Sequence, residues 1–415
     1  MTEELLRKGE LAKKAAFSLA VVDTETKNRA LRAVADALLA ESKSIIEANK
    51  RDIESARKKG IREAMIDRLT LTEERIAGIA EGVRQVAALP DPIGKTVDEW
   101  TRPNGLVISR KRVPMGVIAI IFEARPNVTA DAAALCLKTS NAVILRGGSE
   151  AINSNKAIMK VMQQAAYKAG IPEGSMDIVE DTSRETAREL MRMNGYIDLL
   201  IPRGGAGLIK TVVENATVPV IETAAGNCHV YVDGDCDFDM ATKIVENAKV
   251  SRPSVCNAAE TLLIDQKIAP EYLPVIADVL KKDGVEIRAC EKCLKICPGL
   301  KAATEEDWST EYNDYIIAVK IVDGVSEAIS HINKYNTKHS EAIVTDNPET
   351  AERFLKEVDA AAVYVNASTR FTDGFEFGFG AEIGISTQKM HARGPMGLEQ
   401  LTSIKYVIRG NGQIR

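Results

Sequence analysis

The sequence predicts an α/β protein with two parallel sheets, and three observations support this fold class. Short apolar segments, typical of buried strands, alternate with amphipathic helical segments along most of the chain. The alternation occurs in two series, and the polar segment 233–239, which breaks the pattern, indicates a domain boundary near 231–239. The chain has 415 residues, enough for two or three domains at roughly 150 residues each.

Composition excludes several classes of protein. The chain is 45% hydrophobic and 27% charged, which excludes a disordered or low-complexity chain. Its net charge of −5 argues against a nucleic-acid partner. No apolar run reaches the roughly eighteen residues of a membrane span, and the N-terminus lacks the apolar core of a secretory signal. We therefore expect a cytoplasmic protein, and its seven cysteines, an odd number, favour reduced thiols.

The N-terminal part of the chain is helical in pattern. Apolar residues recur every three or four positions over 31–46 and again over 76–86. The period changes at 100–113, where Asn104-Gly105 separates two extended segments and predicts a tight β-hairpin. The many Arg and Lys residues of this hairpin indicate that it projects or lies at a sheet edge.

Strands and helices then alternate. The strands expected in the first series are 117–122, 142–145, 176–179, 197–201 and 218–221, and the helices between them are 128–139, 151–169, 183–192 and 206–216. A second series starts near His229, with further strands expected at 261–264, 315–322, 342–344 and 361–365. Segments of these lengths favour parallel sheets covered by helices on both faces. Alternation over 403–409 predicts a last strand, which needs a partner.

Two glycine-containing turns follow expected strands of the first series. Pro202-Arg-Gly-Gly-Ala-Gly207 opens a helix, so its backbone N–H groups can approach a phosphate, although a turn that only packs helix on strand would have the same residues. In Arg146-Gly-Gly-Ser149, Arg146 and Ser149 are placed to hold a ribose phosphate. Two such turns at one sheet edge predict a nucleotide site.

Cys256 is the candidate nucleophile. It lies in a polar loop, where a thiol is more exposed and ionisable than in an apolar strand. The alternative is an inert thiol that packs as a small hydrophobe. Glu222 ends an expected strand on the same side as the glycine turns, where it is either a general base or a carboxylate that caps a turn.

The sequence predicts no metal site. Cys290, Cys293 and Cys297 supply three thiols, but their segment contains no histidine to complete a set of four ligands. The four histidines of the chain show no metal-ligand spacing. Cys136 lies in an expected helix and is predicted to be a core residue.

Several long segments resemble one protein family. In order, a Rossmann-like half, a glycine turn after a strand, a glutamate at a strand end and a loop cysteine resemble the aldehyde dehydrogenase superfamily. Within it, the chain is similar to the gamma-glutamyl phosphate reductases. The segments that carry this similarity are Ile201–Ile209, Ala216–Thr223, Gly226–Asp233, Phe371–Gly378 and His391–Ser403. The resemblance extends over essentially the whole chain.

The resemblance implies NADPH-dependent reduction of L-glutamate 5-phosphate to L-glutamate 5-semialdehyde, the second step of proline biosynthesis. Cys256, as a thiolate, would attack the acyl phosphate, expel phosphate and form a thioester that hydride reduces. Backbone N–H groups of Cys256 and Asn257 would stabilise the oxyanion. Glu222 matches the general-base glutamate of the superfamily. Because hydrolysis of the thioester is not wanted here, its expected role is cofactor placement or proton handling.

The resemblance also assigns cofactor residues. Gly204, Gly205 and Gly207 would face the cofactor phosphates, and Glu311 matches the glutamate that binds the nicotinamide ribose. Arg146 takes the place of the lysine at the adenosine ribose. An arginine suits a 2′-phosphate there, which favours NADPH over NADH.

The chain departs from the hydrolytic members of the superfamily after its first sheet strand. Those enzymes carry an oxyanion-binding asparagine in that loop, whereas this chain has Phe122-Glu-Ala-Arg-Pro-Asn127. Asn127 is the candidate replacement. Arg125 would suit the phosphate of the substrate and Arg370 its carboxylate, unless either forms a structural ion pair.

The family fold implies three domains. An NADPH-binding domain would span 1–231 with a return segment at 366–398, a catalytic domain 232–365, and an oligomerisation flap 100–113 with 399–415. The tail strand would add to a neighbour's sheet, so we expect a homodimer or a dimer of dimers. An association with glutamate 5-kinase, which makes the unstable substrate, is a further expectation.

Two other functions compete with this one. A hydrolytic NAD(P)-dependent aldehyde dehydrogenase would need water in place of phosphate. A non-catalytic sensor of redox state or metal would act through Cys290, Cys293 and Cys297, but it explains none of the glycine turns.

Overall fold

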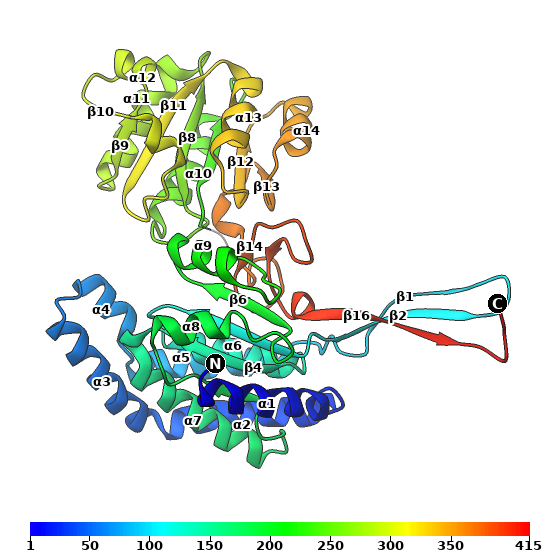
Figure 1. Cartoon of the computed structure of the whole chain (residues 1–415). Helices are drawn as coiled ribbons and strands as arrows, with labels where there is room; N and C mark the ends of the chain where they lie inside the picture. The colour runs from blue at the N-terminus through cyan, green and yellow to red at the C-terminus, as the bar shows by residue number, and fades with distance from the viewer. Residues whose placement is uncertain (224) are drawn as a thin grey trace. The chain divides into compact units, whose positions relative to one another are not determined.

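The protein folds into two compact units, each with its own sheet and helices (Figure 1). The computed structural model describes residues 1–223 and 225–415. The first unit comprises Met1–Thr223, Gly378–Gly384 and Met396–Arg415, and the second comprises 225–377 and Ile385–Pro395. The chain therefore leaves the first unit, builds the second and returns to the first twice.

Helices begin the first unit: α1 (Glu3–Leu19), α2 (Thr24–Ala40), α3 (Ser42–Lys58), α4 (Glu63–Leu69) and α5 (Glu73–Ala88). Thr2, Asp23 and Thr72 precede α1, α2 and α5, and each side chain accepts a hydrogen bond from the backbone N–H three residues later. Such caps satisfy N–H groups that have no partner within the helix. Leu31 and Leu38 are buried, as the apolar period predicts.

The sheet of the first unit is parallel, in the order β5-β4-β3-β6. Its strands are β3 (Val117–Phe122), β4 (Ala142–Gly147), β5 (Met176–Ile178) and β6 (Leu199–Arg203). The accompanying helices are α6 (Asn127–Lys138), η1 (Ser149–Ala151), α7 (Ile152–Lys168), α8 (Arg184–Leu190) and α9 (Ala206–Asn215). These elements agree with the expected segments within a few residues. The strand expected at 218–221 is wrong, since only one bridge joins Leu200 to Val220.

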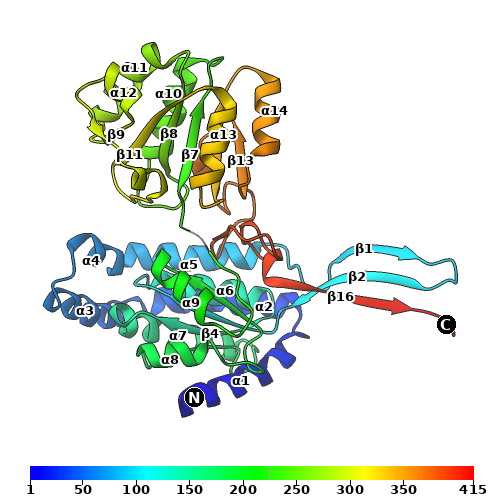
Figure 2. The same ribbon diagram turned by 45° about the horizontal axis from the view of Figure 1, so that its top comes forward.

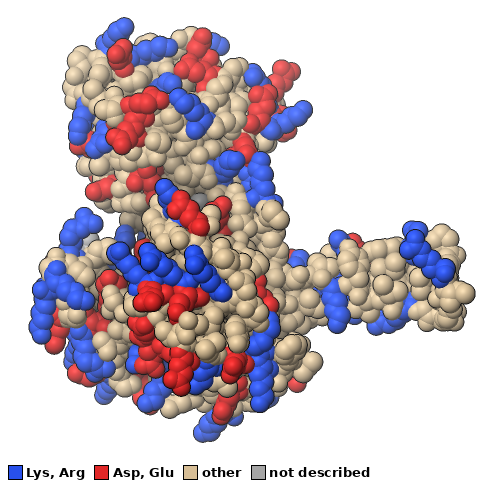
Figure 3. All heavy atoms as spheres, in the orientation of Figure 1, with Lys and Arg blue, Asp and Glu red and all other residues tan. Residues whose placement is uncertain are grey.

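A three-stranded antiparallel sheet, the flap, projects from the first unit (Figure 2). It contains β1 (Thr96–Thr101), β2 (Val107–Pro114) and β16 (Thr402–Arg409), and η4 (Glu399–Leu401) precedes β16. Gly105 has a φ of +87°, which explains the glycine in the turn between β1 and β2. The tail strand β16 pairs with β2 of its own chain. On the face that Figure 3 shows, the surface of the flap between its Lys and Arg side chains is largely uncharged.

The second unit is built on a parallel sheet in the order β10-β9-β11-β8-β7-β12-β13. Its strands are β7 (Cys228–Val232), β8 (Ala259–Asp265), β9 (Glu286–Ala289), β10 (Lys301–Ala302), β11 (Ile316–Val322), β12 (Ser340–Val344) and β13 (Ala362–Val365). Its helices are α10 (Phe238–Val250), α11 (Ala269–Lys282), α12 (Glu291–Ile296), η2 (Glu305–Ser309), α13 (Gly324–Tyr335), α14 (Pro348–Glu357) and η3 (Thr369–Phe371). A short pair, β14 (Ile385–Ser386) and β15 (Gly394–Pro395), completes it.

Successive residues of the central strands in this second sheet serve opposite faces. Val230 and Leu262 pack into one buried apolar cluster, whereas Tyr231 and Leu263 pack into another. This is the two-residue period of a strand that is covered on both sides.

The structure places the boundary between the units earlier than the sequence predicts. The predicted boundary near 231 is too late because β7 pairs with β8 and β12 and so belongs to the second unit. The predicted return at 366 is too early, because η3 lies in the second unit, where the Thr369 hydroxyl donates to the carbonyl of Asn257 at 2.7 Å. Strands β9 and β10, which have only four and two residues, were not expected.

Within the described residues, no helix combines the length and the apolar character that crossing a membrane requires.

Candidate functional site

In the first unit, the predicted binding residues gather at one edge of the sheet. Because β3, β4 and β6 are parallel, the loops that follow them leave the same edge. These loops carry Arg125 and Asn127 after β3, Arg146 and Ser149 at the end of β4, and Gly204, Gly205 and Gly207 after β6. The structure therefore brings together residues that lie about 80 positions apart in the chain.

The glycine turn after β6 holds a carboxylate. The N–H of Gly205 donates to Oε2 of Glu123 at 3.0 Å, at the residue that precedes α9. A Cβ atom on Gly204 would lie 2.6 Å from the Glu123 carboxyl carbon, so a larger residue here would displace the Glu123 side chain. At Gly207 a Cβ would have no neighbour within 4 Å. The turn thus offers an N–H donor to an anion, as a phosphate site requires. Nothing in the sequence marks Glu123 as a site residue, although it is the first residue after β3.

Arg146 is anchored at the same edge. Its Nη2 donates to the carbonyls of Thr182 at 2.5 Å and Ser183 at 3.2 Å. Burial lowers the pKa of this guanidinium, against the charges of Glu150 and Asp181. In the described structure its buried Nε has no hydrogen-bond partner. A buried donor without an acceptor costs roughly 1–3 kcal/mol, which an oxygen of a bound anion would offset.

Asn127 and Arg125 both follow β3 at this edge. Both are exposed, but the Asn127 amide donates to Oδ2 of Asp131 at 2.9 Å, one turn further along α6. Burial raises the pKa of Asp131 to about 6, against this hydrogen bond and the charge of Arg203. In this structure the Asn127 amide is held by an interaction within its own helix, and its contact with the substrate stays a prediction.

In the second unit, Cys256 is half-buried in a loop that joins α10 to β8. The Cys228 thiol donates to the carbonyl of Cys256 at 3.2 Å. A Cβ atom on Gly226 would lie 1.5 Å from the same carbonyl oxygen. Only glycine permits so close an approach of two backbone segments. We call the loop 251–258 the nucleophile loop, after its candidate nucleophile Cys256. Backbone contacts hold this loop in place, and no pattern in the sequence indicated them.

Asn257 and Arg370 lock this loop to η3. The buried Asn257 amide donates to the carbonyls of Arg370 at 3.2 Å and Thr372 at 3.0 Å, and Arg370 Nη1 donates to the Asn257 side-chain oxygen. Arg370 Nε donates to Ser251 Oγ at 3.0 Å. Burial and the charge of Arg252 lower the pKa of Arg370. The Asn257 side chain is therefore an anchor, and its backbone N–H is the group that stays a candidate oxyanion donor.

A buried ion pair joins the two elements on either side of the nucleophile loop. Nζ of Lys249, in the last turn of α10, lies 2.6 Å from Oε2 of Glu260 on β8, and both side chains are fully buried. The second oxygen of Glu260 accepts a hydrogen bond from the backbone N–H of Asn313 at 3.2 Å. Burial raises the pKa of Glu260 to about 7, against the charge of Lys249. This carboxylate joins the nucleophile loop to the segment that carries Glu311.

Glu311 and Glu222 fall in different units. Oε1 of Glu311 accepts a hydrogen bond from the N–H of Gly226 at 2.6 Å, so Glu311 supports the residue that packs on Cys256. Glu222 is half-buried at the end of the first unit, beside Thr223, whose hydroxyl donates to the carbonyl of Pro202. The strand expected before Glu222 is reduced to a bridge.

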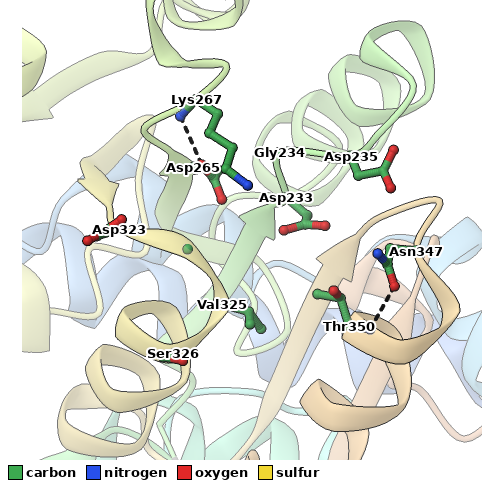
Figure 4. Close-up of a pocket in the computed structure, with 11 residues that line it drawn as sticks. Asp233, Gly234, Asp235, Asp265, Lys267, Asp323, Val325, Ser326, Asn347 and Thr350 are labelled. Carbon is green, nitrogen blue, oxygen red and sulfur yellow. Dashed lines mark hydrogen bonds between the residues drawn. The ribbon is translucent and has the colours of Figure 1, made fainter.

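The second sheet also has a pocket of about 540 Å³, at its carboxyl edge (Figure 4). Asp233 and Asp265 both lie within hydrogen-bond distance of the Tyr231 hydroxyl, at 2.9 and 3.0 Å. Cys256 precedes β8, whereas Asp265 ends it. The pocket and the nucleophile loop are therefore at opposite edges of the sheet, and the pocket is separate from the candidate site.

The other cysteines do not form a metal centre in the described structure. Cys136 is buried in α6, and burial raises the pKa of its thiol. No group of three or more His, Cys, Asp and Glu side chains in the described residues is arranged to hold a metal ion. Cys290 and Cys293 are adjacent, with their sulfur atoms 3.5 Å apart.

Comparisons with known proteins agree with one another. The model of the aldehyde dehydrogenase family matches residues 2–290 and 308–407. A gamma-glutamyl phosphate reductase of Clostridium perfringens is 62% identical over 415 residues, covering 100% of both chains. One from Thermoanaerobacter pseudethanolicus is 60% identical, covering 98% of this chain and 99% of that one. The crystal structure of gamma-glutamyl phosphate reductase from Thermotoga maritima has a TM-score of 0.98 at 51% identity, covering 100% of both chains.

Proposed function

Because the chain belongs to the gamma-glutamyl phosphate reductase family of the aldehyde dehydrogenases, we propose that it reduces L-glutamate 5-phosphate with Cys256 as the nucleophile. The reaction gives L-glutamate 5-semialdehyde and phosphate and is the second step of proline biosynthesis. The observation that carries the assignment of Cys256 is the set of contacts on its backbone, from Gly226, Cys228 and the Asn257 anchor. A nucleophile must be held within a fraction of an ångström to react efficiently.

Cys256 performs covalent catalysis in this proposal. Its thiolate attacks the acyl carbon, the bond from that carbon to the phosphate oxygen breaks, and phosphate leaves, which gives a thioester. After reduction, the carbon–sulfur bond breaks, the aldehyde leaves and the thiolate is restored. The backbone N–H groups of Cys256 and Asn257 are the proposed donors to the oxyanion, a kind of contact that is worth roughly 3–4 kcal/mol per donor in other enzymes.

Arginines are proposed to bind the anionic groups of the substrate. Arg370 lies close enough to Cys256 for their charges to interact, and Arg252 adds a second positive charge that acts on Arg370. Two neighbouring guanidinium groups repel each other, and an anion between them relieves that repulsion. We keep Arg370 as the group for the substrate carboxylate and add Arg252. Arg125, on the first unit, is the proposed group for the phosphate.

The family uses a nicotinamide cofactor, and the first unit has residues that fit one. The Gly205 N–H already binds a carboxylate, and the unpartnered Nε of Arg146 offers a buried donor. Gly204, Gly205, Gly207 and Ser149 would hold the phosphates, and Arg146 the 2′-phosphate of NADPH. When bound, the cofactor supplies the hydride. Glu311 is the proposed ribose contact, and Glu222 the group that handles a proton or places the cofactor.

The flap is the proposed contact between subunits. Trp100, Tyr406 and Ile408 expose 38%, 57% and 59% of their surface on this small sheet. Strand β16 pairs with β2 on one side only, so its other edge is able to pair with a strand of another subunit. We propose a homodimer or a dimer of dimers, checked by light scattering at micromolar concentration. Association with glutamate 5-kinase stays a prediction.

One assay tests the reaction and its nucleophile together. Oxidation of glutamate 5-semialdehyde is followed with NADP⁺ and NAD⁺ in parallel, with and without phosphate, for the native chain and Cys256→Ala. We expect phosphate-dependent activity, greater with NADP⁺, that disappears in Cys256→Ala. Activity without phosphate would favour a hydrolytic dehydrogenase. Activity that survives in Cys256→Ala would contradict the assignment of the nucleophile.

A further inference from the structure

Cys290 and Cys293 form a pair of thiols away from the nucleophile loop. Cys290 follows β9 and precedes the first residue of α12, and Cys293 lies one turn further along. Their sulfur atoms are 3.5 Å apart. Residues three apart share one face of a helix, which explains why the Cys-x-x-Cys spacing brings the two thiols together.

The two thiols have different surroundings. Cys293 is fully buried, with its sulfur 3.6 Å from the carbonyl oxygen of Val319, whereas Cys290 is half-buried at the margin of the core. The contact with the Cys293 side chain lowers the pKa of Cys290 to about 5, with help from backbone N–H groups of Ile321, Cys293 and Lys292 and against the effect of burial. The contact with Cys290 and burial raise the pKa of Cys293.

A half-buried sulfur with a lowered pKa thus lies beside a fully buried one with a raised pKa. This division of roles is what a dithiol needs in order to exchange with a disulfide, since the thiolate attacks first and the second thiol resolves the product.

We propose that Cys290 and Cys293 are a redox-active dithiol that a low-molecular-weight disulfide oxidises to an intramolecular disulfide. The Cys290 sulfur attacks one sulfur of the oxidant, whose own S–S bond breaks, and the first thiolate leaves. The Cys293 sulfur then attacks Cys290 in this mixed disulfide, and the second thiolate leaves and takes up the proton of Cys293. The protein loses two electrons, and the oxidant is reduced to two thiol equivalents.

The geometry allows this bond and separates it from catalysis. A disulfide needs about 2.05 Å between sulfurs, so they must approach by roughly 1.5 Å, which is within the reach of side-chain rotation. Cys290 lies at the carboxyl end of β9, and β9, β11 and β8 are parallel neighbours. Cys256 precedes β8 and is therefore at the other edge of this sheet. The inference does not depend on the proposed reaction.

Peptide mapping of the full-length protein tests the proposal. The reduced protein is incubated with oxidised glutathione, the remaining thiols are blocked with iodoacetamide, and the product is digested with trypsin. Trypsin cleaves after Arg288, Lys292 and Lys295, so the disulfide would join peptide 289–292 to peptide 293–295. We expect this linked pair in the native protein and its loss after treatment with dithiothreitol. Its absence at a glutathione concentration that modifies Cys256 would overturn the proposal.

Variants identify the order of attack. Cys293→Ser should accumulate a mixed disulfide on Cys290, because nothing resolves it, and Cys290→Ser should form neither product. Cys236→Ser is the matched control, since Cys236 is a half-buried thiol of the same unit whose pKa burial raises to about 12, and the linked pair should persist in it. Cys290→Ser should keep native reductase activity.

Other outcomes would contradict the proposal. A native protein that accumulates the mixed disulfide on Cys290 without resolving it, or that links Cys297 instead of Cys293, would show that these two residues are not a dithiol pair. The native digest decides the question even if a variant fails to fold. In the native protein we also expect iodoacetamide to alkylate Cys290 about tenfold faster than Cys236 at pH 7.

Discussion

The two units use opposite edges of their sheets. In the first unit, the candidate binding residues follow β3, β4 and β6 and so lie at the carboxyl edge. In the second unit, Cys256 and Gly226 precede β8 and β7 and lie at the amino edge, while the carboxyl edge carries the pocket around Asp233 and Asp265. The general preference of parallel sheets for binding at the carboxyl edge therefore agrees with the candidate site of the first unit, but it does not locate the candidate nucleophile of the second.

The two edges are also built differently. The glycine turn of the first unit is exposed, and its N–H donor is held by an exposed side chain, Glu123. The nucleophile loop of the second unit is held by buried contacts, among them Lys249 with Glu260 and the anchor Asn257. Exposed contacts of the first kind can be exchanged for contacts with a bound cofactor. Buried contacts of the second kind keep a nucleophile in one position. Substitutions should therefore cost more in the second unit than in the first.

The largest effect is expected at the buried ion pair. Lys249→Met leaves the Glu260 carboxylate buried without its partner and should lower the free energy of unfolding by about 3–5 kcal/mol. Lys249→Met with Glu260→Leu removes both charges and should recover most of that loss. Urea unfolding of both variants measures the difference. A double variant that is as unstable as the single one would show that shape, rather than charge, holds this edge.

Next is the close approach at Gly226. Gly226→Ala places a Cβ 1.5 Å from the carbonyl oxygen of Cys256 and must displace the nucleophile. We expect kcat to fall about 100-fold, as for a shift of about 1 Å in a catalytic group, while nucleotide binding is retained. Gly299→Ala, in the same unit but with no neighbour within 4 Å, is the control. Equal activity in both variants would contradict the inference that the contact with Gly226 holds Cys256 in position.

Asp307 supports the segment that carries Glu311. Its contribution to the free energy of unfolding should depend on pH. Burial acts to raise the pKa of Asp307, but hydrogen bonds from Thr304, Arg288 and Tyr312 together hold it well below its usual value. As the pH falls, Asp307 therefore takes up a proton in the unfolded chain before it does so in the folded chain. The stabilisation is present above about pH 4 and is lost below it.

At pH 7, Asp307→Asn should cost roughly 1.5–3 kcal/mol, and native and variant should converge towards pH 2. Unfolding curves at several pH values measure this convergence. A difference that does not change with pH would show that the charge of Asp307 is not what matters.

The smallest effect is expected in the first unit. Glu123→Gln removes the negative charge at the start of α9, which would otherwise compete with a cofactor phosphate. Since a charge at a helix terminus is worth about 0.3–1 kcal/mol, we expect NADPH to bind two- to fivefold more tightly, as measured by fluorescence titration. Weaker binding would show that Glu123 holds the glycine turn in place and does not compete with a cofactor phosphate for the Gly205 N–H.

The elements with a strong period were predictable from the sequence. Strand β3 agrees with the expected segment at both ends because its six residues are all buried. Asn104-Gly105 marks the hairpin between β1 and β2. Strands β9 and β10 were not predictable, because four and two residues are too few to show an alternating pattern. The expected strand at 218–221 is apolar, but only Val220 forms a bridge. Apolar character alone does not decide whether a segment pairs.

The site was predictable in its residue types and less so in its contacts. Cys256 and the glycine turn stand out by their surroundings in the chain. Glu260 does not, because its partners Lys249 and Asn313 meet it only when α10 and the segment before β11 pack against β8. The backbone N–H of Asn257 stays a predicted oxyanion donor, but nothing in the sequence indicated that its side chain anchors the loop to η3. Long-range hydrogen bonds of this kind leave no local signal.

The pairing of β16 with β2 has a consequence for how the chain acquires its structure during translation. In the ion pair and hydrogen bond that join Arg112 to Glu399 at the base of the flap, the partners are 287 residues apart. The second unit is made almost entirely between them. The ribosome therefore exposes β1 and β2 long before their partner strand exists, and an unpaired edge of this kind is prone to association with other chains. The flap is begun early and completed last, so a nascent chain cannot form the proposed subunit contact until the second unit has been synthesised.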